Sequence, residues 1–227
     1  MLYLGLVAGV VAGNAAAHAA GVDAFRVYVA TLILIPAGLI GARLFYVASH
    51  WRFFRQNPRR IWNRREGGAA QYGGLLVVLP LSVPLLAQLR LDLGAFWDVV
   101  VFTILVSMIF GRIGCLLNGC CAGRPSESWM SMRLPNLERK WQRRLPAQGL
   151  EAAWAAALLV CAIFVRQKLP FAGALFLVVM GGYAAGRLVL ESTREQPPGA
   201  ARFTIHHGMS VAVIVLSLAT LTARWPK

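Results

Sequence analysis

Residues 96–123 read FWDVVVFTILVSMIFGRIGCLLNGCCAG, a membrane-length apolar segment that ends among an arginine, an asparagine and three of the chain's four cysteines. An α-helix needs about 20 mostly apolar residues to cross the ~30 Å hydrocarbon core of a bilayer. The apolar part of the stretch therefore predicts a transmembrane helix. Because lipid penalises the polar groups at its end, we expect Arg112 and Asn118 to be there for a function.

The composition of the whole chain also favours a membrane protein. Of 227 residues, 58% are hydrophobic and only 14% are charged, whereas about 25% of the residues in soluble domains are charged. Lys and Arg outnumber Asp and Glu by 23 to 9. In a membrane protein this excess indicates anionic lipid headgroups rather than nucleic acid as the partner.

Six further segments approach the length of a membrane span. The sequence therefore predicts an all-α polytopic membrane protein, a single domain over residues 1–227 with about seven transmembrane helices. A long polar loop, residues 118–149, separates the fourth and fifth helices because it is too polar to cross lipid. The seven expected helices cover residues 2–20, 25–48, 73–92, 95–117, 150–166, 171–191 and 206–223.

The arginine-rich loops follow the second, fourth and sixth expected helices, so they lie on one side of the membrane. The positive-inside rule would place that side, and the N-terminus, in the cytoplasm.

Charged residues at the ends of the fourth and sixth segments are the main candidates for a site. Arg112 lies about one turn from the end of its segment, and its neighbours Gly111 and Gly114 would let a ligand or another helix approach closely. Arg187, Glu191 and Arg194 are spaced i, i+4, i+7 and share one helical face. They form either a surface ion pair worth tenths of a kcal/mol or an arginine held by a carboxylate to grip a phosphate.

Other polar residues near segment ends allow two interpretations. Arg43 either reaches the interface, with Tyr46 as a belt residue, or belongs to a site. Tyr72 precedes two glycines where the backbone could approach a ligand, and His207 at the start of the last segment is either an interfacial residue or functional.

The cysteines Cys115, Cys120 and Cys121 form no CxxC pair, and the sequence offers no convincing fourth zinc ligand. We therefore expect no metal at these cysteines. Small, weakly polar residues that line a site are the favoured interpretation, with metal binding and redox chemistry as alternatives.

Residues 111–123, which contain Arg112, Asn118 and the three cysteines, resemble the signature GRxGNFxNxExxG of the prolipoprotein diacylglyceryl transferase family. Four further blocks resemble family motifs in the family's order and bring the resemblance over nearly the whole chain. They are GARLFY (41–46), YGG (72–74), LPAQGLE (145–151) and RLVLESTR (187–194).

This chain departs from the family pattern at three positions. Tyr72 stands where the family has a histidine, Cys115 where it has an asparagine and Cys120 where it has a glutamate. The resemblance therefore predicts the fold better than it predicts the substrate.

The resemblance implies transfer of a diacylglyceryl group from phosphatidylglycerol to the lipobox cysteine thiol of a lipoprotein precursor, without a metal or cofactor. The donor is anionic, so Arg112 and Arg187 would bind its phosphate, with Glu191 and Asn118 orienting them. The base would be Tyr72 or, better by proton affinity, His207. The expected substrate-binding residues are Arg43, Tyr46, Gly73, Gly74, Gly111, Gly114, Cys115, Cys120, Gly123, Gln148, Glu151 and Arg194.

The family resemblance also implies a monomer in the bacterial inner membrane whose site faces the outer side. This orientation conflicts with the positive-inside count. Two alternatives to the transferase stay open: a non-catalytic lipid-binding or accessory protein of the same fold, and a related transferase with another acceptor. A thiol-active membrane protein is a third.

Overall fold

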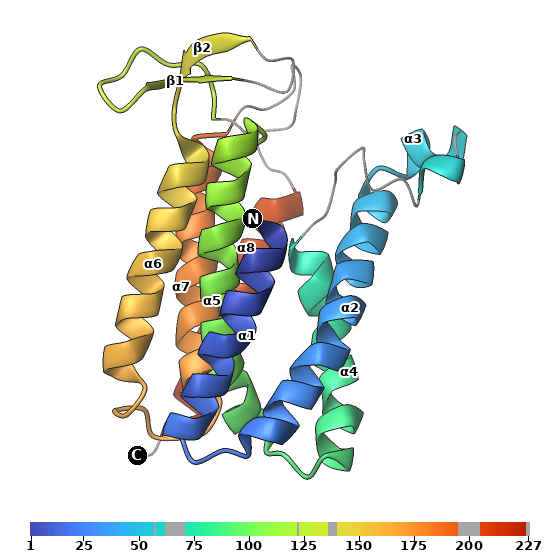
Figure 1. Ribbon diagram of the computed structural model, residues 1–227, viewed down its shortest axis with the longest axis vertical. Helices are drawn as coiled ribbons and strands as arrows, with labels where there is room; N and C mark the ends of the chain where they lie inside the picture. The colour runs from blue at the N-terminus through green and yellow to red at the C-terminus, as the bar shows by residue number, and fades with distance from the viewer. Residues whose placement is uncertain (57, 62–70, 122, 136–139, 195–204, 226–227) are drawn as a thin grey trace. The chain divides into compact units, whose positions relative to one another are not determined.

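The computed structural model describes residues 1–56, 58–61, 71–121, 123–135, 140–194 and 205–225 (Figure 1). These residues form mostly helices, as expected, and divide into two compact units. Unit 1 contains Met1–Gly21 and Gly94–Lys227, and unit 2 contains Val22–Leu93. The helices of unit 1 are α1 (Leu2–Ala19), α5 (Leu93–Asn118, which begins at the boundary), α6 (Ala147–Val165), α7 (Ala174–Glu191) and α8 (Ile205–Arg224).

Five described helices are long and apolar enough to cross a membrane. They are α5, α6, α7, the part of α8 from His207 to Arg224, and α2 (Ala24–Ser49) of unit 2. The apolar parts of α1 and of α4 (Gln71–Gln88) are shorter. The expectation of seven spans depends on these two helices and stays a prediction.

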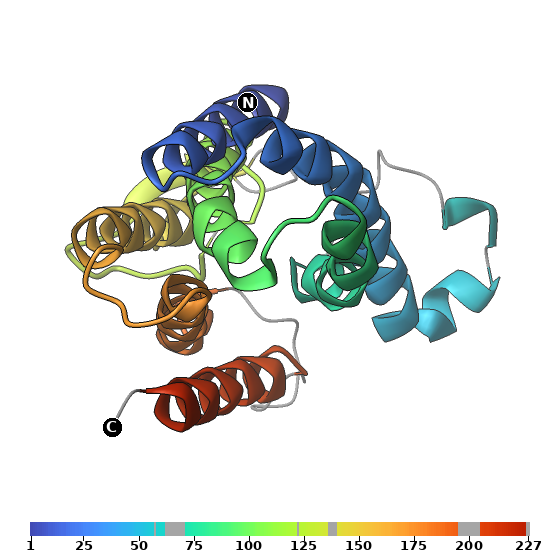
Figure 2. The same ribbon diagram turned by 90° about the horizontal axis from the view of Figure 1, so that it is seen from below.

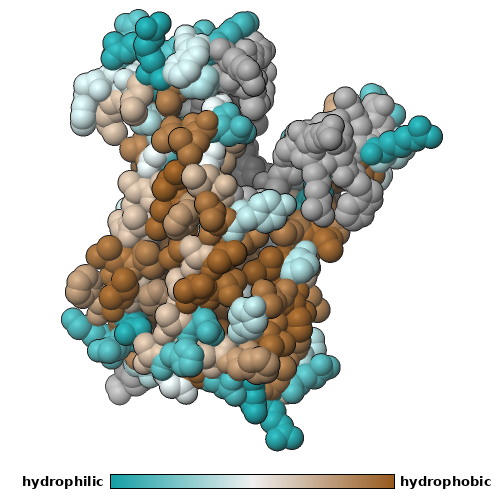
Figure 3. Space-filling view, in the orientation of Figure 1, coloured by the Kyte–Doolittle hydropathy of each residue, from teal (hydrophilic) through white to brown (hydrophobic). Residues whose placement is uncertain are grey.

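The surface of unit 1 suits lipid on its sides and water at its ends. Large apolar side chains are exposed on its helices, among them Val11, Phe164 and Val215. Figure 3 shows apolar side chains covering these helices between hydrophilic ends. Lipid tails can solvate such apolar side chains, so their exposure indicates a membrane-facing surface.

The polar region 118–149 differs from the expected loop, because it contains a β-hairpin. Strands β1 (Met132–Pro135) and β2 (Trp141–Arg144) pair antiparallel, with Met132 opposite Arg144. The strand β2 is also held by the preceding segment, since the Ser126 N–H donates to the Arg143 carbonyl at 3.1 Å. Strands of four residues carry too little alternation to be found from sequence. The structure is mostly helical, as expected, and the short hairpin within the polar region is an addition that the sequence did not predict.

Small residues bring α1 and α5 of unit 1 together, and the two helices lie side by side in Figure 2. A Cβ added at Gly9 would collide with Ser107 and with the Thr103 carbonyl, and one at Gly5 would lie 2.9 Å from Phe110 Cβ. The Ser107 hydroxyl also donates to the Gly5 carbonyl at 2.9 Å. Glycines spaced by four residues allow this close approach, which is the usual basis of helix association in lipid.

Asp98 of α5 caps the N-terminus of α7. Its carboxylate accepts hydrogen bonds from the Gly173 N–H (2.7 Å) and the Phe176 N–H (2.9 Å). These are two of the backbone donors that a helix N-terminus leaves without an intrahelical acceptor, and a carboxylate there also interacts favourably with the helix dipole. The cap therefore fixes one end of α7 against α5.

We expect Asp98→Ala to lower the free energy of unfolding by about 1–2 kcal/mol, the cost of losing a helix cap. Thermal unfolding of the purified protein in detergent would measure this. Asp23→Ala is the matched control, because Asp23 caps α2 through the Arg26 N–H from an exposed position. An Asp98→Ala effect no larger than that of Asp23→Ala would contradict the special role of this cap.

Unit 2 consists of α2, α3 (Trp51–Gln56), the short 3₁₀-helix η1 (Pro58–Arg60) and α4. Glycines bring α2 and α4 into backbone contact. A Cβ at Gly73 would lie 2.8 Å from the Gly41 carbonyl oxygen, and one at Gly74 would lie 2.9 Å from the Gly38 carbonyl oxygen. In this structure Gly73 and Gly74 therefore serve helix packing, and the ligand contact expected for them stays a prediction.

Candidate active site

The C-terminus of α5 sets the position of the polar groups at one end of unit 1. The helix ends in a Schellman motif, in which Gly119 takes the left-handed conformation (φ 68°). The Cys120 N–H donates to the Cys115 carbonyl at 3.1 Å and the Gly119 N–H to the Leu116 carbonyl at 3.3 Å. Glycine is favoured at this position because it has no Cβ to clash.

Glu151, in the second turn of α6, is the centre of an ion-pair cluster. Its Oε2 lies 2.6 Å from Arg112 Nε of α5, and its Oε1 lies 2.8 Å from Arg187 Nη1 of α7. Arg194, just after α7, donates to the same Oε1 from Nη2 at 2.7 Å and from Nε at 2.9 Å. One carboxylate thus joins three arginines from two other parts of the chain.

Glu191 has a narrower role than the sequence suggested. It forms an ion pair with Arg187 Nη2 at 2.8 Å, one turn away on α7. The carboxylate that bridges Arg112 to Arg187 is Glu151, which the sequence placed only among the substrate-binding residues. Three arginines and two glutamates leave this cluster with a net charge of 3 − 2 = +1.

The members of the cluster differ in how far solvent reaches them. The exposed fraction of the side chain is 6% for Glu151, 9% for Arg187, 13% for Arg112 and 23% for Arg194. Because the pairs are largely buried, their electrostatic interactions are screened less than those of surface pairs. An incoming anion would meet Arg194 and Arg112 first.

Backbone contacts close the site around the segment that follows the cysteines. The Arg124 N–H donates to the Thr193 carbonyl at 2.9 Å, and the Leu145 N–H donates to the Arg124 carbonyl at 3.1 Å. Gly123 pairs with Arg194 as an antiparallel bridge, and a Cβ there would collide with the Leu145 carbonyl. The segment therefore passes between the end of α7 and the residues that precede α6, where only glycine fits at position 123.

Two buried polar side chains hold this frame. Gln148 Nε2 donates to the Cys120 carbonyl at 2.7 Å, and Arg144 Nη1 donates to the Gly123 carbonyl at 3.3 Å. Sequence reasoning counted Arg144 only as one loop charge among many. The sequence held no signal to separate it from the exposed Arg143, because its burial depends on the unrecognised hairpin, in which only the last residue of β2 is buried.

The remaining predicted residues of unit 1 lie at different places. Asn118 is exposed at the last residue of α5, and His207 is partly buried near the start of α8. A Cβ at Gly111 would meet no described atom within 4 Å, whereas one at Gly114 would lie 2.7 Å from Met1 Cβ. Space for a ligand is thus available at Gly111, while Gly114 accommodates the N-terminal residue.

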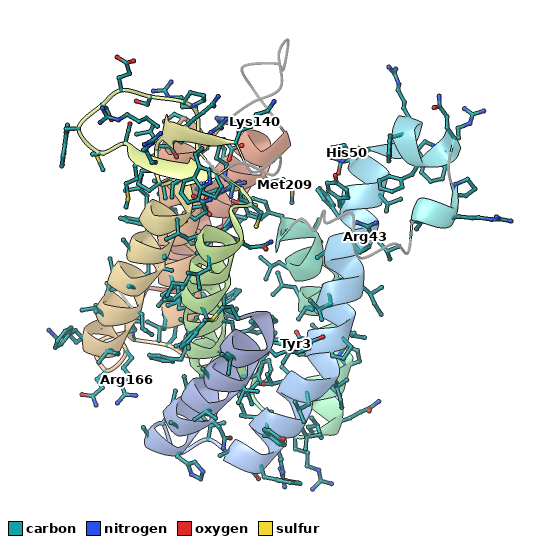
Figure 4. The ribbon with its side chains drawn as sticks, turned by 45° about the horizontal axis from the view of Figure 1, so that its top comes forward. Tyr3, Arg43, His50, Lys140, Arg166 and Met209 are labelled. Atoms are coloured by element: carbon teal, nitrogen blue, oxygen red, sulfur yellow. The ribbon has the colours of Figure 1, made fainter. Side chains whose placement is uncertain are left out.

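In unit 2, Arg43 is held by its own surroundings. Its Nε donates to the Ile61 carbonyl at 2.9 Å, and its guanidinium lies 5.7 Å from the Tyr46 ring centroid and 5.5 Å from that of Phe54. Figure 4 shows Arg43 and His50 near the same end of α2. Tyr72, at the start of α4, is buried. No role in binding or catalysis follows from these contacts alone.

The three cysteines at the end of α5 gather at one point. The sulfurs of Cys115, Cys120 and Cys121 all lie within 4.8 Å of one another. A hydrogen bond from the Cys115 thiol lowers the pKa of Cys121 to about 5, helped by Arg194 and Arg112, although partial burial acts in the opposite direction. The lowered pKa favours the thiolate of Cys121, which is the nucleophilic and metal-binding form.

Comparison with known proteins agrees with this arrangement of motifs. Residues 1–223 match the family model described as prolipoprotein diacylglyceryl transferase. A phosphatidylglycerol–prolipoprotein diacylglyceryl transferase of Dehalococcoides mccartyi is 30% identical over 197 residues, covering 85% of this chain and 74% of that protein. Proteins of the same name from Bacillus cereus (26% identical, 85% and 74% covered) and Clostridium botulinum (26%, 82% and 76%) are also similar.

Proposed function

The chain belongs to the prolipoprotein diacylglyceryl transferase family, and from this premise we propose how its residues perform diacylglyceryl transfer. The donor is phosphatidylglycerol, and the acceptor is the lipobox cysteine thiol of a lipoprotein precursor. The acceptor thiolate attacks the glyceryl carbon that carries the phosphate ester. The new C–S bond forms as the C–O bond to phosphate breaks, the thiol proton passes to a base, and glycerol phosphate leaves with the electron pair.

The observation that carries this proposal is the Glu151 cluster. Negative charge gathers on the leaving phosphate during the reaction, so groups that are already oriented toward it lower the barrier. Glu151 holds Arg112, Arg187 and Arg194 within 2.6–2.9 Å of one carboxylate. The net positive charge of the cluster then favours a bound anion, and guanidinium groups suit phosphate by their fork geometry.

The three arginines divide the work by their exposure. Arg194 and Arg112 are the more accessible and would contact the phosphate. Both terminal nitrogens of Arg187 face carboxylates, Nη1 toward Glu151 and Nη2 toward Glu191. Arg187 is therefore better suited to positioning Glu151, and through it Arg112, than to direct contact with the donor.

Gln148 offers a hydrogen-bond acceptor for the donor's headgroup. Its side chain is 1% exposed, and its Oε1 accepts no hydrogen bond from the described residues. A buried acceptor without a partner costs about 1–3 kcal/mol, so it indicates a place for a ligand donor. A glycerol hydroxyl of phosphatidylglycerol would supply one, while Gln148 Nε2 stays on the Cys120 carbonyl.

Mass spectrometry provides the direct test of the function. The purified protein is incubated in phosphatidylglycerol vesicles with a lipobox-containing precursor peptide, and the peptide is expected to gain the mass of one diacylglyceryl group. A peptide whose cysteine is replaced by serine is the control. Lipid binding without any mass gain would contradict the proposal and favour the accessory lipid-binding alternative.

The base can be assigned by comparing two variants. Histidine is the side chain that most often acts as a general base, so we expect His207→Gln to lower the transfer rate about 100-fold or more and Tyr72→Phe to lower it less. If Tyr72→Phe instead gave the larger loss, Tyr72 would be the better assignment.

The membrane arrangement completes the proposal. We place seven spans across the bacterial inner membrane by adding α1 and α4 to the five longer helices. The Glu151 site then faces the outer side, as the family resemblance implies, with the basic loops beside the anionic lipid that they attract. The protein acts as a monomer. A variant that retains only Cys121 would be placed in sealed vesicles, and its thiol would be labelled from outside or from inside. The side from which Cys121 reacts gives the orientation of the site.

A further inference from the structure

The cysteine cluster at the end of α5 has no part in the transfer proposed above. Among the described residues, Cys115, Cys120 and Cys121 are the one group of three or more side chains whose ligand atoms come close enough to hold a metal ion. All three are free thiols, and Cys121 is exposed while the other two are partly buried. An ion could thus reach the cluster from outside and still be partly enclosed.

The backbone places these sulfurs together without help from an ion. The Schellman motif at Gly119 turns the chain back over the last turn of α5, so that Cys120 and Cys121 approach Cys115. Cys121 itself takes a left-handed conformation (φ 58°), which is uncommon for a residue other than glycine and costs about 1–3 kcal/mol. Unfavourable backbone conformations persist where the surrounding structure fixes them, and they gather at functional sites.

Contacts from other elements fix this turn on both sides. Gln148 of α6 holds the Cys120 carbonyl at 2.7 Å, and Gly123 is enclosed by the Leu145 and Thr193 carbonyls. The turn therefore cannot open without breaking contacts with α6 and with the end of α7. A pre-organised set of ligands binds an ion with a smaller entropy cost than a flexible one.

The distances fit three thiolates around one ion. A Zn–S bond is about 2.3 Å, so two thiolate sulfurs on one zinc ion lie roughly 3.8–4.0 Å apart. The sulfurs here lie within 4.8 Å of one another, and rotation about the side-chain bonds of the cysteines covers the difference. Three protein ligands with one open position are the arrangement of catalytic rather than structural zinc sites.

The ligand type selects the class of ion. Thiolates are soft ligands that favour Zn²⁺, Cu⁺ and similar ions over Mg²⁺ and Ca²⁺, which prefer oxygen. Three thiolates and a divalent ion carry a net charge of −1. Arg112 lies one turn before Cys115 on α5, and Arg112 and Arg194 both act electrostatically on Cys121, so neighbouring cations offset that charge.

We propose that Cys115, Cys120 and Cys121 bind one thiophilic metal ion through three sulfurs and leave a fourth coordination position open. This goes beyond diacylglyceryl transfer and does not depend on it. It also replaces our expectation of no metal, because the absence of a fourth protein ligand excludes a closed structural site but not an open one.

The test is a titration of the reduced full-length protein in detergent, without phospholipid, using Cd²⁺ as the probe. We expect one Cd²⁺ per chain, reported by thiolate-to-metal charge-transfer absorption, and no binding of Mg²⁺. Cys115→Ser, Cys120→Ser and Cys121→Ser should each lower the affinity for Cd²⁺ at least about 100-fold. Mutating a residue that only supports a metal ligand already lowers metal affinity by up to about 100-fold, and loss of a ligand should cost at least as much. Cys161→Ser is the matched control and should bind as the wild type does.

A second measurement covers variants that fail to fold. X-ray absorption of the Zn²⁺-loaded wild type should show three sulfur ligands at about 2.3 Å. Binding that survives in the variant with all three cysteines replaced would overturn the proposal. So would a disulfide between two of the three sulfurs in freshly isolated protein, which would assign the cluster to redox chemistry. Because no lipid substrate is present, neither outcome bears on the transferase function.

Discussion

Glu151→Ala is expected to abolish diacylglyceryl transfer and to lower the free energy of unfolding by about 3–5 kcal/mol. Removing one partner of a buried ion pair leaves an uncompensated buried charge, which costs about this much. Here the loss leaves Arg112, Arg187 and Arg194 with only Glu191 among the cluster's carboxylates. Thermal unfolding and peptide lipidation, followed by mass spectrometry, would measure the two effects separately.

Two further variants separate the stability effect from the catalytic one. Glu151→Gln keeps the shape of the side chain but removes its charge, so it should retain more stability than Glu151→Ala and still lose most of the transfer. Glu127→Gln removes a charge from an exposed glutamate of the same polar region and should change neither quantity measurably. A Glu151→Ala protein as stable and active as the Glu127→Gln control would refute the central role of this carboxylate.

Arg112→Lys is expected to lower kcat for transfer by about 100- to 1,000-fold, the loss typical of removing one group that stabilises transition-state charge. A lysine keeps the positive charge but offers one ammonium in place of a planar fork, so it cannot reproduce the bidentate geometry toward a phosphate while it also contacts Glu151. The Nε contact of 2.6 Å with Glu151 would be lost. Initial rates of peptide lipidation at saturating phosphatidylglycerol would measure the change.

The control for Arg112→Lys is Arg55→Lys, which changes an exposed arginine of α3 in the same way. Arg55→Ala serves the same purpose for Arg187→Ala, since a surface arginine contributes only about 1 kcal/mol of attraction to anionic lipid. We expect both site variants to lose more activity than their controls. Equal losses in a pair would mean that the arginines act only by attracting the membrane surface.

The sequence predicted the helices and the candidate charges well, because both depend on local pattern. The apolar length of residues 95–117 became α5, and the i, i+4 spacing of Arg187 and Glu191 became an ion pair. The same reasoning could not predict that Glu151 would join the arginines. Its bonds reach Arg187 and Arg194 across 36 and 43 residues, and no periodicity links such positions.

The hairpin and the cysteine cluster were missed for related reasons. The strand β2 is four residues long and only its last residue is buried, so no alternation in the sequence could mark Arg144 as buried and Arg143 as exposed. The convergence of Cys115 with Cys120 and Cys121 depends on the left-handed turn at Gly119. A glycine after a helix suggests such a turn, but the direction in which the next side chains point also depends on contacts from α6 and α7.

The Asp98 cap and the Glu151 cluster join α5 to α7 near opposite ends of the same pair of helices. Because the two helices are held at both ends, α7 cannot slide along α5 or move away from it unless both sets of contacts break. Any rearrangement that admits a bulky precursor or discharges the lipidated product is therefore left to less firmly fastened helices. Of the five long apolar ones, α8 is the least enclosed, with 11% of its span buried.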